Sequence, residues 1–316
     1  MTDRSHFGAT TTADEVVAGL DLTGKRAIVT GASGGLGAEA ARVLARAGAA
    51  VTLTARDRSK GEKVLAEIRS TAPRAELELR ELELSEPASV RRFAAEWLAD
   101  HRSLELLLLN AGVMACPLRR SAEGFELQFA TNHLGHFLLT LRLAPALLAG
   151  APARVVAVSS GGHQISPVVF DDIHFERRAY EPWSAYGQAK TANVLFAVEL
   201  DRRLAGRGVR AFAVHPGMIP TELGRHLTRE SIRQIRERAS SGGEPPKSIP
   251  QGAATEVWAA TAPELAGQGG IYLADCGVAP PAAPGVRGYA PHAVDPLAAA
   301  RLWQISEQLV GERFET

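Results

Sequence analysis

Short apolar runs alternate with longer amphipathic stretches along most of the chain. The apolar runs are strand-sized, and several are rich in Val, Ile and Leu without strict alternation, as expected for strands covered on both faces. They lie at residues 26–30, 50–55, 77–84, 104–109, 154–159, 210–215 and 270–273. Helical patterns occupy the stretches between them, at residues 37–47, 59–70, 87–99, 124–148 and 185–204. This alternation predicts an α/β fold in which a doubly wound parallel sheet of about seven strands carries helices on both faces.

The ends of the chain depart from this alternation, and so does one internal segment. Residues 1–22 precede the first strand and predict an N-terminal extension. Residues 221–250 bring a charged segment and a loop rich in Ser, Gly and Pro. A tail rich in Pro, Ala and Gly, residues 279–296, comes before a last helical pattern at 297–309. Because no repeat and no long linker divides the remainder, we predict a single domain over residues 23–316.

Composition excludes several classes of function. Lys plus Arg total 35 and Asp plus Glu total 35, and the lack of a long basic run argues against a nucleic-acid partner. No stretch approaches the ~20 apolar residues of a membrane helix, and the N-terminal residues lack the apolar core of a signal peptide. Two cysteines, Cys116 and Cys276, are too few for a disulfide framework and indicate a reducing compartment. We therefore expect a cytoplasmic protein with no membrane partner.

A glycine-rich turn follows the first predicted strand and opens the first helix. Gly31, Gly35 and Gly37 are spaced Gly-x-x-x-Gly-x-Gly, which differs from the Gly-x-Gly-x-x-Gly of many dinucleotide folds. Glycines permit a tight turn and a close approach of the backbone to a pyrophosphate, whose charge is favoured by helix N–H groups. An ordinary glycine-rich turn is the alternative, but the strand-turn-helix context favours a nucleotide.

The end of the second predicted strand indicates which dinucleotide binds. An acidic residue at this place would bind the ribose hydroxyls of NAD and repel the 2′-phosphate of NADP. Here Ala55 is followed by Arg56, whose guanidinium can engage that phosphate through a bidentate contact. Alternatively, Arg56 is a surface residue that Asp57 partly neutralises. The sequence favours NADP(H), and NAD(H) stays possible.

Tyr186 and Lys190 lie one turn apart on one face of a predicted helix. A phenol beside an ammonium can become a proton donor near neutral pH, because positive charge lowers its ordinary pKa of ~10. For the pair alone, a solvated Tyr–Lys face is the alternative. Ser159-Ser160 and Asn132 also have alternatives, a strand-end cap and a residue at a helix bend. Together with the glycine turn, and in this order, the residues indicate an oxidoreductase.

These motifs resemble the short-chain dehydrogenase/reductase superfamily, and more narrowly its retinol-dehydrogenase-like and WW-domain-oxidoreductase-like branch, which includes many bacterial proteins. The resemblance runs from about residue 22 to residue 221. It rests on Thr30-Gly-Ala-Ser-Gly-Gly-Leu-Gly37, Leu109-Asn-Ala-Gly112, Asn132-His-Leu-Gly-His-Phe137, Val158-Ser-Ser160, Tyr186-Gly-Gln-Ala-Lys190 and His215-Pro-Gly217. It implies a Rossmann fold and an NAD(P)-dependent enzyme that acts on the CH–OH group of a small molecule.

The resemblance also implies catalytic roles. Tyr186 would donate the proton to a carbonyl during reduction, and Lys190 would lower the pKa of that tyrosine and bind the nicotinamide ribose. Ser160, rather than Ser159, would hydrogen-bond the substrate oxygen, and Asn132 would hold a water that connects Lys190 to solvent. The logic is physical: hydride attack builds negative charge on oxygen, so a hydroxyl donor and a proton source beside it lower the barrier.

Contacts to the dinucleotide are implied in the same way. Glu83 and Leu84 would border the adenine, residues 110–112 would pass beside its ribose, and residues 216–221 would lie beside the nicotinamide carboxamide. The implied set is Gly31, Ser33, Gly35, Leu36, Gly37, Arg56, Glu83, Leu84, Asn110, Ala111, Gly112, Tyr186, Lys190, Pro216, Gly217, Ile219 and Thr221.

Some positions differ from the compact members of the superfamily. Residues 161–185 form an insertion that is expected to border the substrate pocket, and residues 222–250 are expected to form a lid over it. Ala189 stands where many relatives have Ser, and Glu83 replaces a common Asp, which affects the expected adenine contacts. No spacing of His and Cys gives a convincing zinc set, so no metal is expected.

Three functions compete. The first is an NADP(H)-dependent reductase or dehydrogenase, such as a ketoreductase, for a carbonyl/alcohol pair in a fairly apolar small molecule. The alternative is a catalytically silent NADP(H)-binding sensor or interaction protein. The third, a sugar-nucleotide epimerase or dehydratase, usually has the spacing Gly-x-x-Gly-x-x-Gly, which this chain lacks. A homo-oligomer through paired helices is possible, unless the long tail blocks that surface.

Overall fold

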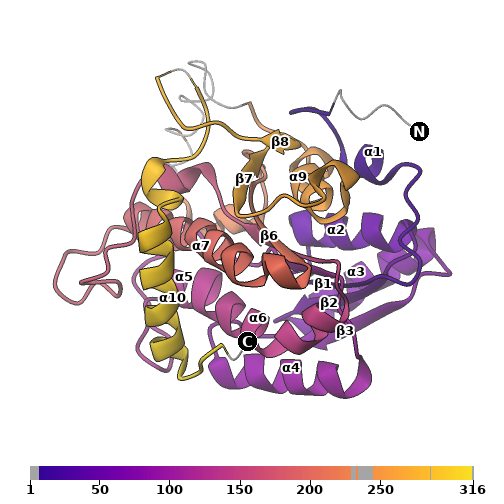
Figure 1. The fold of residues 1–316 in the computed structure, drawn as a ribbon, viewed down its shortest axis with the longest axis horizontal. Helices are drawn as coiled ribbons and strands as arrows, with labels where there is room; N and C mark the ends of the chain where they lie inside the picture. The colour runs from indigo at the N-terminus through magenta and orange to yellow at the C-terminus, as the bar shows by residue number, and fades with distance from the viewer. Residues whose placement is uncertain (1–6, 229–232, 234–244, 285, 315–316) are drawn as a thin grey trace.

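The computed structural model describes residues 7–228, 233, 245–284 and 286–314, and its centre is one sheet (Figure 1). Its strands are β1 (Arg26–Val29), β2 (Ala50–Ala55), β3 (Leu77–Glu81), β4 (Leu106–Leu109), β5 (Ala153–Val158), β6 (Val209–His215), β7 (Ile271–Ala274) and β8 (Gly277–Val278). They are ordered β3-β2-β1-β4-β5-β6-β7-β8. All neighbours pair in parallel except β7 and β8, which are antiparallel. The predicted doubly wound parallel α/β sheet is confirmed, and β8 is a short strand that the sequence patterns did not predict.

Helices cover both faces of this sheet, because successive side chains of each buried strand point to opposite faces. Ile28 of β1 and Leu107 of β4 join one apolar core, whereas Val29 and Leu108 join the other. The first core contains residues of α4 (Pro87–Asp100), α6 (Gly135–Ala149), α7 (Pro182–Leu204) and α10 (Pro296–Val310). The second contains residues of α1 (Ala13–Val17), α2 (Gly35–Arg46), α3 (Arg58–Thr71) and α9 (Ile249–Thr261).

The predicted helix at residues 124–148 is interrupted. It consists of α5 (Leu127–Phe129), a π-helical turn η1 (Ala130–Leu134) and α6, which follow one another without a gap. In this turn the N–H of Gly135 bonds the carbonyl of Ala130, five residues earlier. A π-turn of this kind often marks a functional site, and this one carries Asn132.

Helix α9 was not predicted, and its first two residues fall in the segment 221–250 that was interpreted as a charged stretch and a loop. Pro250 lies in the first turn, where proline is compatible with a helix. Ser248 and Gln251 form a capping box, in which each side chain bonds the backbone N–H of the other residue. This box is the sequence signal that marks the start of the helix.

The two ends of the chain pack on the sheet's helices. In α1, Ala13 and Val16 are fully buried, and the helix contacts α2 and α9. At the other end, α10 stands across α7 (Figure 1). Its Trp303 stacks on Phe196 of α7 at 6.0 Å between ring centres. The last helix of the tail therefore covers part of the outer surface of α7.

Candidate active site

Tyr186 and Lys190 lie in the first half of α7, and the residues just before them specify where this helix begins. Glu181 caps the helix by accepting hydrogen bonds from the N–H groups of Trp183 and Ser184, and Pro182 occupies the first turn. Both side chains are 3% exposed. The Lys190 Nζ donates to the carbonyl of Val158 at 2.8 Å. The pair thus lies at the carboxyl end of β5, on the edge of the sheet where α/β folds bind their ligands.

The protonation of this pair is controlled by burial. Burial raises the pKa of Tyr186 to about 12, although a hydrogen bond with Ser160 lowers it in part. Burial also lowers the pKa of Lys190 to about 8. The net shift of the Tyr186 pKa is upward because burial outweighs the hydrogen bond with Ser160, and the lowering of this pKa by Lys190 stays a prediction. Removing the phenolate from water thus costs more than the neighbouring groups return.

The adjacent serines have different surroundings. Ser159 is 2% exposed, and its Oγ donates to the carbonyl of Lys190 at 2.8 Å. Ser160 is half-buried and caps the 3₁₀ turn η2 (Gly161–Gln164), where its Oγ accepts from the N–H of Gly162 at 3.0 Å. Gly162 has no room for a side chain, since a Cβ there would lie 2.8 Å from Tyr186 Cε1. Ser160 therefore faces Tyr186, while Ser159 faces the backbone of α7.

Asn132 joins the same set from the π-turn η1. Its Oδ1 accepts from the N–H of Val113 at 2.8 Å, and its Nδ2 donates to the carbonyl of Val113 at 2.9 Å. A Cβ on Gly112 would lie 3.1 Å from Asn132 Oδ1 and 3.7 Å from Lys190 Nζ. The structure thus brings Asn132, Lys190 and the loop after β4 together, with the Asn132 side chain holding that loop.

Two buried histidines flank Asn132. His136 shares a hydrogen bond with the Asn132 carbonyl through Nδ1 at 3.0 Å and with Thr30 Oγ1 through Nε2 at 2.9 Å. His133 Nε2 bonds Ser306 Oγ of α10 at 2.8 Å. Burial lowers the pKa of both rings to about 3, so both are neutral. No group of three or more His, Cys, Asp or Glu in the described part of the chain could hold a metal ion.

The glycine turn lies against the loop after β4. Gly31 has φ of +68°, and a Cβ there would approach Ala111 Cα to 2.8 Å. A Cβ on Gly37 would meet the Asn110 side chain and lie 2.7 Å from the Gly31 carbonyl oxygen. Asn110 Nδ2 donates to the Thr30 carbonyl at 2.9 Å. Close backbone contact therefore requires glycine at these positions.

The first turn of α2 fits an anion. Its N-cap, Gly34, provides no side-chain bond to the first N–H groups, which leaves them to an outside acceptor. Ser33, Gly35 and Leu36 are half-buried. A Cβ on Gly35 would lie 3.6 Å from Thr221 Cγ2, so Thr221 lies next to this turn. This arrangement fits the pyrophosphate of a dinucleotide.

Helix α9 supports two of the expected cofactor residues from behind. A Cβ on Gly252 would lie 2.6 Å from Ile219 Cγ1 and 2.8 Å from Leu36 Cδ2. Ile219 and Leu36 therefore both pack on α9 at Gly252, where any larger residue would collide with them. This contribution of Gly252 was not predicted, because the helix itself was not predicted. Pro216 and Gly217 follow β6, and Gly217 has φ of +96°.

At the adenine end, Arg56 is available to a ligand. Its side chain is 70% exposed, and its guanidinium is 3.5 Å from Glu83 Oε2. Asp57 caps α3 by accepting from the N–H of Lys60 at 3.2 Å. Leu84 is 5% exposed, and Glu83 also accepts hydrogen bonds from Ser85. A largely exposed guanidinium therefore stands at the end of β2.

The expected lid, residues 222–250, lies partly outside the described residues. It begins with the 3₁₀ turn η4 (Glu222–His226). At its end, Lys247 is tied down: its N–H bonds the Met218 carbonyl at 2.8 Å, and its ammonium pairs with Asp275. Lys60 of α3 pairs with Glu222 at 2.9 Å, so the start of this segment contacts α3.

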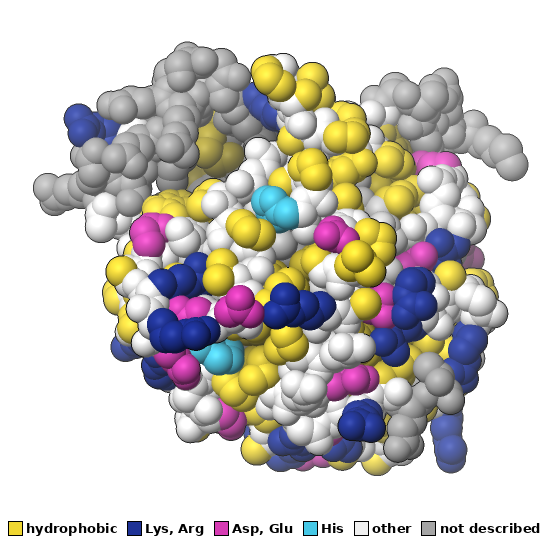
Figure 2. All heavy atoms as spheres, turned by 60° about the vertical axis from the view of Figure 1, so that its left-hand side comes forward, with side chains coloured by type: hydrophobic (Ala, Val, Ile, Leu, Met, Phe, Trp, Pro, Cys, Tyr) yellow, Lys and Arg dark blue, Asp and Glu magenta, His cyan; other side chains and the backbone are white. Residues whose placement is uncertain are grey.

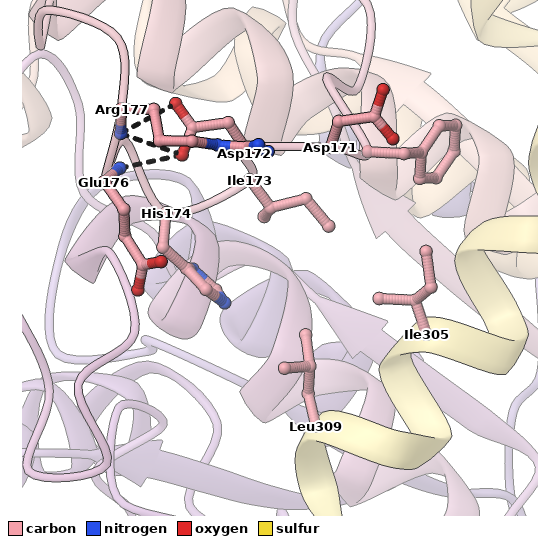
Figure 3. Close-up of a pocket in the computed structure, with 9 residues that line it drawn as sticks. Asp171, Asp172, Ile173, His174, Glu176, Arg177, Ile305 and Leu309 are labelled. Atoms are coloured by element: carbon pink, nitrogen blue, oxygen red, sulfur yellow. Dashed lines mark hydrogen bonds between the residues drawn. The ribbon is translucent and has the colours of Figure 1, made fainter.

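A groove of about 260 Å³ lies elsewhere, between the insertion 161–185 and α10 (Figure 3). Its floor contains Ile173, Ile305 and Leu309, and charged residues from the insertion border it. Neither Ser160, Tyr186 nor Lys190 lines it. On the side of the molecule drawn in Figure 2, basic and acidic side chains of the described residues are interspersed.

Comparison with known proteins fixes the family. The model of the short chain dehydrogenase family matches residues 25–231. A probable oxidoreductase of Streptomyces antibioticus is 44% identical over 90% of this chain and 97% of its own. Human retinol dehydrogenase 12 is 42% identical over 94% of this chain and 89% of its own. A solved structure from Mycobacterium paratuberculosis is 36% identical, with a TM-score of 0.74 over 95% of this chain and 98% of that chain.

The chain therefore belongs to the short-chain dehydrogenase/reductase family, in the branch that contains the retinol dehydrogenase 12 proteins. It has the Rossmann-type α/β fold and is an oxidoreductase of the class that acts on CH–OH groups with NAD(P). Among the residues that the structure describes, no helix combines the length and the apolar character needed to cross a membrane.

Proposed function

We propose that the enzyme interconverts a carbonyl and an alcohol on a fairly apolar small molecule and prefers NADP(H), with NAD(H) as a possible substitute. One observation carries the proposal: the Tyr186 ring and the Ser160 hydroxyl both lie against Gly162 at the carboxyl edge of the sheet, since a Cβ on this glycine would lie 2.8 Å from Tyr186 Cε1 and 3.4 Å from Ser160 Oγ. Lys190 is buried one turn further along α7. Two hydroxyl groups thus converge where a substrate oxygen can accept from both.

Each residue of the set has a role in moving or holding a proton. The Tyr186 hydroxyl donates its proton to the substrate oxygen during reduction and takes it back during oxidation. The Ser160 hydroxyl donates a second hydrogen bond to the same oxygen. Lys190 holds positive charge near the phenol and binds the nicotinamide ribose, and Asn132 holds the water that connects Lys190 to solvent. When bound, the nicotinamide dinucleotide supplies or accepts the hydride.

The cofactor would lie across the carboxyl edge of β1, β2 and β4. The N–H groups of α2 would bind its pyrophosphate, Arg56 would bind the 2′-phosphate, and Glu83 and Leu84 would border the adenine. Residues 110–112 would lie beside the adenine ribose, and residues 216–221 beside the carboxamide. The exposed Arg56 guanidinium and the uncapped first turn of α2 support this placement.

An apolar substrate suits the surroundings of Tyr186. The Trp183 ring lies 6.0 Å from the Tyr186 ring, edge to face, and is half-buried. Retinol, which the name of the human relative specifies for that protein, is an apolar alcohol. We carry over the apolar character of the substrate and leave its identity to experiment.

We propose a cytoplasmic location. Both cysteines are free and buried, which agrees with a reducing compartment. If the protein forms a homo-oligomer, the contact has to avoid the part of α7 that α10 covers, or α10 has to move.

The test is NADPH consumption by the purified protein across a panel of aldehydes and apolar ketones, with NADH and Tyr186→Phe as controls. Turnover with NADPH that is lost in Tyr186→Phe is the expected result. Tight NADPH binding without turnover in either direction across the panel would favour the silent sensor. Product isomerisation without net loss of NADPH would favour the epimerase class, and failure to bind either dinucleotide would refute the proposal.

A further inference from the structure

His215 is the last residue of β6, and it lies between two loops that the proposed function needs. One loop follows β5 and carries Ser160; the other, Pro216-Gly217, is the expected bed of the nicotinamide. The parallel pairing of Val158 with Val214 sets these loops side by side, and the N–H of Ser159 continues it by bonding the Val214 carbonyl at 2.8 Å. The end of β6 is therefore fixed against the start of the Ser160 loop.

One nitrogen of the His215 ring connects the two loops. Its Nδ1 accepts from the N–H of Gly161 at 3.1 Å and from the N–H of Gly217 at 3.4 Å. Because both donors are backbone N–H groups, the neutral ring carries its proton on Nε2. A Cβ on Gly161 would lie 3.4 Å from His215 Nε2, so the ring packs directly over this glycine.

Each of these two glycines is joined to groups of the candidate site. Gly161 begins the η2 turn that Ser160 caps, and the next residue, Gly162, packs against the Tyr186 ring. Gly217 has φ of +96° and leads into Met218, whose carbonyl accepts from the Lys247 N–H. A shift of the His215 ring would therefore displace Ser160 and the Pro216-Gly217 loop relative to each other.

We propose that His215 is a positioning residue, whose Nδ1 holds the Ser160 loop and the Pro216-Gly217 loop in register for hydride transfer. This proposal rests on the proposed function. Displacement of reacting groups by about 1 Å can cost ~100-fold in rate. Loss of the Nδ1 acceptor is expected to lower the turnover number by about 10–100-fold, with a smaller change in the affinity for NADPH.

Three replacements of His215 distinguish the effect of the Nδ1 acceptor from the effect of the volume of the ring. Asn places a carbonyl oxygen near the position of Nδ1, Gln places one nearer Nε2, and Leu has no acceptor. His215→Asn should retain most of the activity, whereas His215→Gln and His215→Leu should lose it. Trp97→Phe is the control for general destabilisation, because it removes one buried hydrogen bond, to Thr52 at 3.0 Å, far along the chain from both loops.

The first measurement is amide hydrogen exchange by mass spectrometry on the protein without substrate. His215→Leu and His215→Gln should speed exchange in the peptides that contain Gly161 and Gly217, while His215→Asn and Trp97→Phe should not. Unchanged exchange in both peptides, or faster exchange in only one, would overturn the proposal. If His215→Leu does not fold, His215→Gln decides the matter. Since this readout needs no substrate, it stands even if the proposed reaction fails.

The second measurement is turnover with NADPH deuterated at the transferred position. His215→Gln should raise the isotope effect on kcat above that of the wild type, because a longer transfer distance makes the chemical step limiting. His215→Asn should restore the wild-type value. Wild-type turnover with no difference among the three variants would overturn the positioning role and leave the proposed function intact.

Discussion

The Lys190 ammonium lies 5.7 Å from the centre of the Tyr186 ring. Both side chains are 3% exposed, so the protein places a cation and a phenol together away from water. For an ordinary protein core this arrangement is unfavourable, because an unpaired buried charge costs stability. A cost of this kind is characteristic of functional sites, which keep perturbed groups for their chemistry.

The pair gives a prediction in which activity and stability move in opposite directions. In the folded protein the pKa of Lys190 is lowered from its ordinary 10.5 to about 8. Between these two pH values the unfolded chain binds more protons, so the free energy of unfolding rises with pH across this window. Below pH 8 the folded state bears the full cost of the buried charge. Lys190→Met should therefore raise the free energy of unfolding at pH 7 by on the order of 2 kcal/mol, which moves the urea midpoint to a higher concentration. This gain in stability should shrink by pH 10.

The same variant should lose turnover by at least ~100-fold, as expected for removal of a group that supports proton transfer. Lys63→Met is the matched control, since Lys63 is exposed on α3 and should change neither property. Urea denaturation at the two pH values, together with the carbonyl assay, checks both parts. A Lys190→Met protein that is less stable at pH 7 than the wild type would contradict the assignment of a buried charge.

Replacement of each of the two adjacent serines by alanine should have a different effect, on kcat for one and on stability for the other. Ser160→Ala removes a donor to the substrate oxygen and should lower kcat by about 100-fold with little loss of stability. Ser159→Ala removes the buried bond to the Lys190 carbonyl and should lower the free energy of unfolding by about 1–2 kcal/mol, with a smaller effect on kcat. Steady-state kinetics and thermal melts of both proteins decide this. The reverse pattern would assign the catalytic hydroxyl to Ser159.

Cofactor preference should depend on Arg56. Arg56→Ala is expected to raise the Kd for NADPH by about 10–100-fold, the range for loss of charged hydrogen bonds, and to leave the Kd for NADH unchanged. Arg58→Ala is the control, since Arg58 is comparably exposed and pairs with Glu62 on α3. Glu83→Gln should tighten NADPH binding, because it removes the carboxylate beside Arg56. Titration of NADPH fluorescence measures all three, and equal losses for both dinucleotides would refute the role of Arg56.

Much of this fold could be predicted because its signals are local. Strand β2 occupies residues Ala50–Ala55 as expected, since its apolar run has clear limits in the sequence. The order of the motifs along the chain likewise specified which residues meet at the carboxyl edge of the sheet. Helix α9 could not be predicted in this way. Gly252 looks like a breaker until Leu36 and Ile219, distant in sequence, are seen to require its small size.

The pKa values and positioning contacts of the site were harder to predict than the residues that form it. The direction of the Tyr186 pKa depends on how completely the ring is buried, and burial is set by the packing of Gly162 and its neighbours. The positioning role of His215 could not be predicted from the sequence, because the bond to its ring comes from Gly161, 54 residues away along the chain. Properties that arise between distant segments leave no periodic pattern in a single sequence.

A second buried ionisable group, Glu256 of α9, allows a stability prediction away from the catalytic set. It is fully buried, and both carboxyl oxygens lack a hydrogen-bond partner among the described residues. Burial raises its pKa from the ordinary 4.5 to about 8. As pH rises between these values, the unfolded chain loses its proton first, so the free energy of unfolding falls across this window and stays low above it.

Glu256→Gln should remove this dependence and be more stable than the wild type at pH 8, by about 1–3 kcal/mol, with little difference at pH 4.5. Glu199→Gln is a control in which the free energy of unfolding at pH 8 should change in the opposite direction. Glu199 is 1% exposed but pairs with Arg202 and Arg203, which help to lower its pKa, so its contribution is present above pH 4.5. That variant should lose stability at pH 8. Urea denaturation of both variants from pH 4.5 to pH 8 is the measurement, and parallel curves for Glu256→Gln and wild type would show that Glu256 is solvated or paired in solution.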